Sequence, residues 1–230
     1  HYQRLLALNP AMAGHAVNGA VPGASMSTLV GQVGGVAAAQ PDYVTVLLGG
    51  GDVCFGTTST ATFAAQFRAG MDALFTASPD TRVLVASIWD LESQRSAVLG
   101  ANPSATFPFC GSFFNASAAS RAATMSRVAA YNDVLATECA TYAHCRYDGG
   151  ALFDHAWTAA EISPVDNFHP SAAGEAMIAD VLWDAGYQWG LPTPTSKDQC
   201  KNGGWRTFTD DAGAPFRNQG QCVAFTNRLR

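Results

Sequence analysis

The chain has 230 residues, of which 48% are apolar and only 13% are charged, and its formal net charge is −5. This length and composition allow a sizeable core in one large domain, or in one domain with a small appendage. The sequence has no basic run, which argues against nucleic acid and anionic membranes as partners. It also has no apolar run long enough to predict a transmembrane segment.

The six cysteines lie in the sequence as three near pairs. Six cysteines allow many connectivities, so pairing by proximity is a hypothesis. No C-x-x-C occurs, and no His/Cys cluster has the spacing of a zinc site, so we expect neither a metal nor another cofactor. Three disulfides in an oxidising compartment, and hence a secreted protein, are the better interpretation. The pairs are Cys54 with Cys110, Cys139 with Cys145, and Cys200 with Cys222.

Helical and extended patterns alternate up to about residue 88. Apolar residues recur at helical spacing over 1–8, 25–39 and 60–75, which predicts three helices. Residues 14–21 are a strand candidate that runs into a Pro-Gly turn. Two further segments, 43–48 and 82–88, are nearly continuous apolar runs of the kind found in strands buried on both faces.

The pattern is weaker in the following segment, 89–121. It shows little periodicity and contains two prolines, so we predict a surface loop over the site. A helix is expected over 122–139, then a short strand within 145–153 and a closing helix that extends to about Trp189.

Strands that alternate with helices predict an α/β fold, in which helices cover both faces of a parallel sheet. Ligands of such sheets bind beyond the carboxyl ends of the strands. Here those ends are Val21–Gly23, Gly49–Asp52 and Trp89–Asp90, and they converge with a late loop that carries His169. We expect Asp52 to hold its own loop by local hydrogen bonds.

The stretch VDNFHP, residues 165–170, places Asp166 three residues before His169. Pro170 suits the first position of a helix, and the apolar positions after it recur at helical spacing. In this arrangement the carboxylate can accept from one ring nitrogen and leave the other free as a general base. The same spacing also arises by chance around structural histidines. The neighbouring Asp154-His155 pair is interpreted as part of a solvated loop.

A change of composition near the C-terminus indicates a second, smaller part. Residues 1–190 form the main domain, the Pro/Thr/Ser segment 191–196 is a linker, and 197–230 form a small module with Cys200 and Cys222. Such a segment buries little surface and would depend on its disulfide.

These motifs resemble the SGNH (GDSL-like) hydrolases, in particular the secreted actinobacterial lipase/esterase-like branch, over residues 1 to about 190. The segment NGAVPGA, 18–24, is similar to the family's second block, and LLGGGDVC, 47–54, to its third. The resemblance implies a three-layer α/β/α fold with flavodoxin-like strand order. It also implies that Asp166 and His169 are the catalytic acid and base, and that Gly23 donates its backbone N–H to the oxyanion.

Two features depart from the family pattern. The first is that no Gly-Asp-Ser occurs, so the nucleophile and the first strand that carries it are expected upstream of His1. In the strand order that the resemblance implies, that first strand lies between strands at 15–21 and 43–49. We therefore predict a gap there, and a chain that is incomplete at its N-terminus. The second departure is Gly51, which occupies the oxyanion position of the family's asparagine. Losing one oxyanion donor typically costs about 10²–10³ in turnover.

Two functions compete on these grounds. The first is a monomeric serine ester hydrolase acting on small-molecule or lipid esters, with apolar acyl contacts from the Phe-rich part of 89–121 as an option. The second is a catalytically inactive SGNH-like binding module. The missing nucleophile and Gly51 favour the second, whereas retention of Asp166 and His169 favours the first.

Overall fold

The computed structural model describes residues 1–187, 193–210 and 216–228. The chain divides into two compact units, His1–Leu182 and Trp183–Arg230. The strands of the first unit are β1 (Tyr43–Val46), β2 (Arg82–Val85) and β3 (Cys145–Tyr147). Its α-helices are α1 (Tyr2–Leu8), α2 (Leu29–Ala37), α3 (Gly50–Cys54), α4 (Thr60–Ala77), α5 (Leu91–Ala101), α6 (Gly111–Phe114), α7 (Ala118–Cys139) and α8 (Ala172–Leu182). Its 3-10 turns are η1 (Pro10–Met12), η2 (Met26–Thr28) and η3 (Ala159–Glu161).

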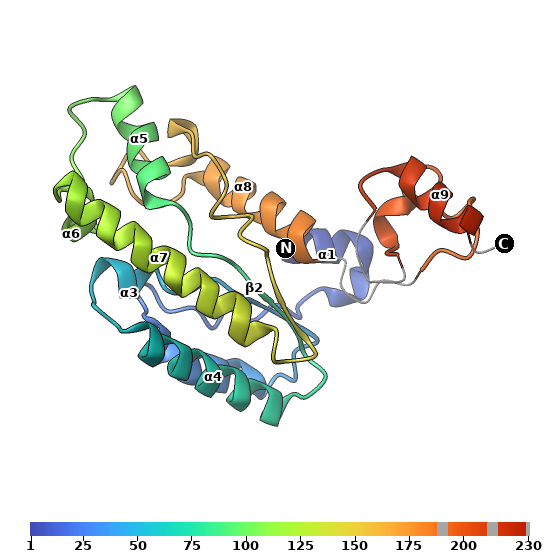
Figure 1. Cartoon of the computed structure of the whole chain (residues 1–230). Coiled ribbons are helices and arrows are strands. Elements are labelled where there is room, and N and C mark those ends of the chain that lie inside the picture. The colour runs from blue at the N-terminus through green and yellow to red at the C-terminus, as the bar shows by residue number, and fades with distance from the viewer. Residues whose placement is uncertain (188–192, 211–215, 229–230) are drawn as a thin grey trace. The chain divides into compact units, whose positions relative to one another are not determined.

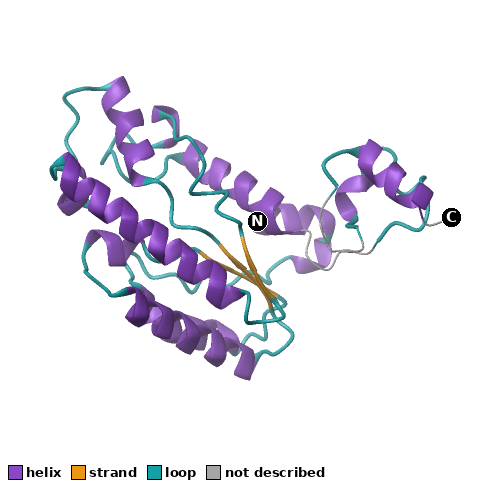
Figure 2. Cartoon of the chain, in the orientation of Figure 1, coloured by secondary structure: helices purple, strands orange, loops and turns teal. Residues whose placement is uncertain are grey.

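The three strands form one parallel sheet in the order β1-β2-β3 (Figures 1 and 2). Side chains of β2 alternate between its two faces, as the pleat requires. Val83 and Val85 pack in the main core, which also contains buried residues of α2, α4 and α7. Leu84 and the following Ala86 pack in a second cluster with Leu182 of α8. Helices therefore cover both faces of the sheet, and the predicted three-layer α/β fold is confirmed.

The predicted strand over 14–21 is wrong, because these residues have no regular secondary structure. The Asn18 side chain accepts a hydrogen bond from the N–H of Ala20, which turns the chain locally. At Gly19 the backbone lies so close to α2 that a Cβ would be 2.6 Å from Val36 Cγ1. An extended segment becomes a strand only beside a partner, and β1 pairs with β2 alone among the described strands. Since 14–21 is not a strand, the structure does not test the predicted gap, and a missing strand beside β1 stays a prediction.

The prediction of a surface loop over 89–121 is also wrong, because the segment contains α5, α6 and the start of α7. Asp90 is the N-cap of α5, and its Oδ1 accepts from the N–H groups of Glu92 and Ser93. The buried face of α5 includes Gln94, a polar residue that hides the helical period from a count of apolar positions.

The closing helix begins two residues later than predicted. Pro170 forms an isolated antiparallel bridge with Ile162, and Ser171 Oγ accepts from the N–H of Gly174 in the first turn of α8. Beyond Leu182, residues Trp183–Tyr187 form the π-helical turn η4. The predicted end of the helix at Trp189 lies outside the described residues.

All three predicted disulfides are present: Cys54–Cys110, Cys139–Cys145 and Cys200–Cys222. The first joins the end of α3 to the start of α6. The second joins the end of α7 to β3 across six residues. Each of these links two elements around the sheet, and together the three bonds indicate an oxidising compartment.

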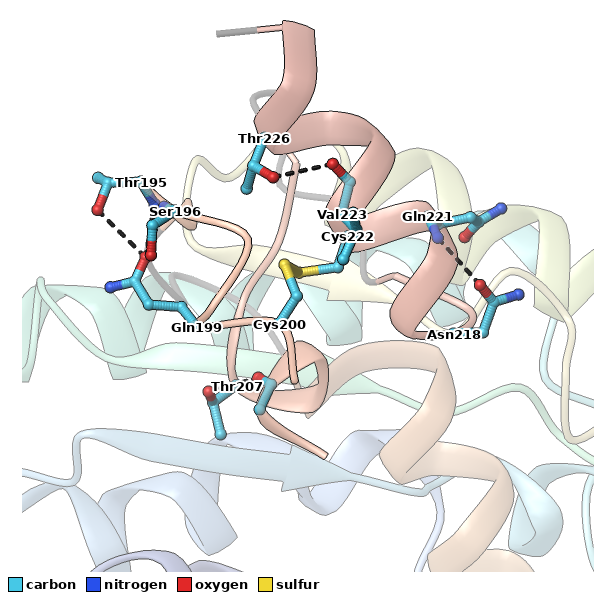
Figure 3. Close-up of a disulfide and its surroundings, with 11 residues drawn as sticks. Thr195, Ser196, Gln199, Cys200, Thr207, Asn218, Gln221, Cys222, Val223 and Thr226 are labelled. Atoms are coloured by element: carbon cyan, nitrogen blue, oxygen red, sulfur yellow. Dashed lines mark hydrogen bonds between the residues drawn. A yellow bond between two sulfur atoms is a disulfide. The ribbon is translucent and has the colours of Figure 1, made fainter. Parts of the chain in front are cut away.

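The second unit contains the 3-10 turn η5 (Gly204–Thr207) and the helix α9 (Gln219–Arg228). Its core is the Cys200–Cys222 disulfide with Phe216 and Phe225. Figure 3 shows this disulfide, which joins the residue after Gln199 to α9. Part of the predicted linker is folded here, because Gln199 Oε1 accepts from the N–H groups of Thr195 and Ser196. Residues 191–192 of that linker lie outside the described residues.

Candidate active site

Asp166 and His169 lie on a tight loop between η3 and α8. Asp166 Oδ2 is 2.6 Å from His169 Nδ1, and Asp166 Oδ1 accepts from the N–H groups of Phe168 and His169 at 3.0 Å each. Asn167 between them has φ +58°, a left-handed conformation that asparagine tolerates better than most residues. The loop is closed at its base, where the Ser163 N–H donates to the His169 carbonyl at 2.8 Å.

The Asp166 carboxylate is mostly buried, with 15% of its side chain exposed, whereas 56% of the His169 side chain is exposed. Burial alone would raise the pKa of Asp166. Hydrogen bonds from the His169 ring and from the two loop N–H groups outweigh it and lower the pKa. The carboxylate is thus ionised near neutral pH and holds the Nδ1–H tautomer. Within the described residues His169 Nε2 makes no hydrogen bond, and it is free to accept a proton.

Gln94 braces this loop, and no motif in the sequence pointed to it. It is fully buried on α5 and donates from Nε2 to the Phe168 carbonyl, while its Oε1 accepts from Trp89 Nε1 at 2.9 Å. A second brace comes from Asn167, whose Nδ2 donates to the Thr106 carbonyl at 2.9 Å. Amide side chains provide both a donor and an acceptor, which suits them to bridging two elements.

Gly23 and Gly51, the two predicted oxyanion positions, lie against each other. Gly23 has φ +71° in the turn before η2, and Gly51 is in the first turn of α3. A Cβ at residue 51 would be 2.3 Å from the Ala24 carbonyl oxygen and 2.9 Å from that of Gly23. The Gly23–Ala24 backbone therefore occupies the space that an asparagine side chain would need. This close approach explains the glycine at position 51.

Asp52 holds its own loop through Thr58, as predicted, and it also joins that loop to the distant loop before η2. It is 1% exposed, its Oδ2 accepts from the Met26 N–H at 2.7 Å, and its Oδ1 accepts from Thr58 Oγ1 at 2.8 Å. Its two carboxylate oxygens are used by these bonds. Asp52 thus fixes the loop before η2 against α3.

Trp89 lies between the glycine loops and the Asp166/His169 loop. A Cβ at Gly50 would be 3.3 Å from Trp89 Cη2, and the Trp89 ring is 6.4 Å from that of Phe168. Trp89 lies four residues after the end of β2, on the side of the sheet where the sequence predicted the site. The structure thus connects the segments around Gly51 and His169 through the partly buried Trp89 and Phe168.

The four phenylalanines of segment 89–121, which was predicted to be a loop, differ in their burial. Phe107, Phe113 and Phe114 are at most 6% exposed and belong to the core. Phe109 is 44% exposed, and its ring meets the His169 ring edge-on at 5.1 Å. Of these four side chains, Phe109 alone is available to a ligand.

Asp154 and His155 lie on one loop, as predicted, where Asp154 is exposed and His155 is partly buried. His155 Nε2 lies 3.2 Å from Glu161 Oε2, and Glu161 also accepts from the Thr158 N–H in a capping box. Burial raises the pKa of Glu161, but the hydrogen bonds from Thr158 and His155 outweigh this and lower it. This pair supports η3, the element before the candidate site.

No group of three or more His, Cys, Asp or Glu side chains in the described residues is placed to hold a metal ion. Nor does any helix in the described part of the chain have the length and apolar character required to cross a membrane.

A parallel sheet covered by helices on both faces, with a paired aspartate and histidine on a loop before its last helix, defines the class as an α/β protein. The model of the GDSL-like lipase/acylhydrolase family matches residues 1–177, so the chain belongs to that family. Comparisons with curated proteins and with solved structures gave no significant match.

Proposed function

We propose that this protein hydrolyses carboxylic esters through a serine acyl-enzyme, with His169 as the general base and Asp166 as the residue that orients it. The observation that carries the proposal is the 2.6 Å contact between Asp166 Oδ2 and His169 Nδ1, combined with an exposed and unbonded Nε2. Membership of the acylhydrolase family supports the same reaction class.

In this mechanism the serine Oγ attacks the ester carbonyl carbon while His169 Nε2 takes its proton. The carbonyl oxygen becomes an oxyanion. The proposal assigns its stabilisation to the backbone N–H groups of Gly23 and Gly51, neither of which donates a hydrogen bond within the described residues. Collapse breaks the carbon–oxygen bond, and the alcohol leaves with the proton from His169. Water then repeats the sequence on the acyl-enzyme and releases the carboxylic acid.

The nucleophile in this proposal is a serine upstream of His1. All six cysteines are in disulfides, and no described serine hydroxyl is hydrogen-bonded to His169. We further propose a monomeric, extracellular enzyme acting on small-molecule or lipid esters, which agrees with its three disulfides. Assignment to the actinobacterial lipase/esterase-like branch stays a prediction.

The alternative is a catalytically inactive binding module, and one observation favours it. The place of the family's oxyanion asparagine is filled by the Gly23–Ala24 backbone, so Gly51 provides at most a backbone N–H. An inactive domain would retain the fold without turnover.

The test is hydrolysis of short and medium p-nitrophenyl esters by residues 1–230 and by the same chain with its gene-encoded upstream residues. We expect turnover only from the extended chain, and its loss in His169→Ala. An extended chain that folds, keeps its disulfides and hydrolyses no ester would favour the binding module. Turnover that survives His169→Ala would contradict the assignment of the base.

A further inference from the structure

Phe109 is a large apolar side chain that stays exposed directly beside the candidate base. Its ring is 5.1 Å from the His169 ring, at an interplanar angle of 70°, and is stacked at 6.4 Å on Phe168. The nearby Phe107 and Phe114 are instead buried in the core, where their rings stack on each other at 4.7 Å. Phe109 thus stays exposed although the three other phenylalanines of the segment are buried.

The backbone around Phe109 is fixed. Cys110, the next residue, has φ +51°, which is uncommon for a residue other than glycine. Its side chain is bonded to Cys54, at the end of α3, and it starts α6. A strained conformation held by a disulfide is a typical feature of functional sites. It directs Phe109 towards the imidazole ring.

The reaction geometry decides which part of an ester meets this ring. In the proposed mechanism His169 gives its proton to the leaving alcohol oxygen, so that oxygen lies within hydrogen-bond reach of Nε2. A ring in edge contact with the imidazole is then next to the alcohol portion. The acyl chain leaves the carbonyl carbon in another direction, away from the leaving oxygen.

We propose that Phe109 determines specificity for the alcohol portion of the ester, and that this portion is apolar or aromatic. The inference rests on the proposed function and adds to it the chemical class of the leaving group. An aromatic or alkyl alcohol packs on the exposed Phe109 ring, whereas a small polar alcohol leaves that ring in water.

The test compares two ester series on the extended chain. In one, the acyl group is acetyl and the alcohol varies from methyl through butyl to benzyl. In the other, the alcohol is p-nitrophenol and the acyl group varies from acetyl to octanoyl. We expect Phe109→Ala to lower the benzyl-to-methyl ratio of kcat/KM about three- to tenfold. It should leave the slope of the acyl series unchanged, and Phe109→Leu should fall between.

Phe55→Ala is the matched control. Phe55 is 68% exposed and follows Cys54, on the other side of the same disulfide, but its ring makes no contact with His169 in the described structure. It should leave both series unchanged. The inference is overturned if Phe109→Ala weakens the dependence of kcat/KM on the acyl group as much as its dependence on the alcohol. It is also overturned if the variant changes neither dependence. In both cases ester hydrolysis itself still stands. A wild-type chain that hydrolyses no ester overturns the proposed function, and the inference with it.

Discussion

Replacing Gln94 by methionine tests whether the amide brace beneath the catalytic loop has the role that its contacts indicate. Methionine has a similar size and length but cannot donate to the Phe168 carbonyl or accept from Trp89 Nε1. The substitution thus removes both bonds while filling the same buried space. It does not change the side chains of Asp166 and His169 themselves.

The expected loss follows from the two groups left without partners. A buried donor or acceptor that loses its partner costs about 1–3 kcal/mol. Trp89 and Phe168 are only partly buried, so water can reach part of this region and the lower end applies to each. We therefore expect a decrease of about 2 kcal/mol in the free energy of unfolding. Release of the Phe168–His169 backbone should also reduce kcat about tenfold or more, since small displacements of a catalytic group are costly.

Gln66→Met is the control for this experiment. Gln66 Oε1 is buried but has no hydrogen-bond partner within the described residues. Its replacement should change the free energy of unfolding by less than about 0.5 kcal/mol. Urea unfolding and ester turnover are compared for both variants. In Gln94→Glu both quantities should also depend on pH, because only the protonated acid can donate to the Phe168 carbonyl. If Gln94→Met costs no more than Gln66→Met, the brace is not functional.

Three further predictions concern other contacts. The folded-state pKa of Asp166 is lowered, so its carboxylate stabilises the fold above about pH 4, the ordinary Asp pKa, and this contribution is lost as pH falls through the folded pKa. Asp166→Asn should therefore flatten the acid limb of a thermal-melting profile, and an unchanged limb would contradict this. Gly51→Ala should destabilise the chain by about 1–3 kcal/mol in urea unfolding, because its Cβ would meet the Ala24 carbonyl, and unchanged stability would refute the close approach. Replacing Cys200 and Cys222 by serine should lower the free energy of unfolding of the second unit by about 3 kcal/mol. In limited proteolysis, that unit alone should then be cleaved earlier. Equal loss of the first unit would show that the two do not fold separately.

The parts of the fold that the sequence predicted are those set by local pattern. The β-branched run around Val44 and the helical spacing around Phe67 indicate a strand and a helix without tertiary information. The disulfide pairs were inferred correctly from the order of the cysteines, although Cys54 and Cys110 are 56 residues apart and the fold brings them together. The Asp166–His169 contact was predicted from spacing, because three residues in a tight loop leave few geometries.

The errors have physical causes that a single sequence does not display. Residues 14–21 have the composition of a strand, but a strand needs a bonded neighbour, and this segment pairs with none of the described strands. The helix α5 was hidden because its buried face carries Gln94, whose polarity is satisfied only by Trp89 and Phe168. From the sequence, Gly51 was interpreted as the loss of an oxyanion donor. The structure gives a steric reason for this glycine, because the Gly23–Ala24 backbone lies where a side chain would extend.

The most direct test of the central claim is labelling with a fluorophosphonate, which bonds covalently to an activated serine. Intact-mass spectrometry of the extended chain should show one adduct, and peptide mapping should place it on a serine upstream of His1. His169→Ala should abolish the adduct while the three disulfides remain intact. Absence of any adduct, or an adduct that does not depend on His169, would contradict a serine hydrolase that uses this histidine as its base.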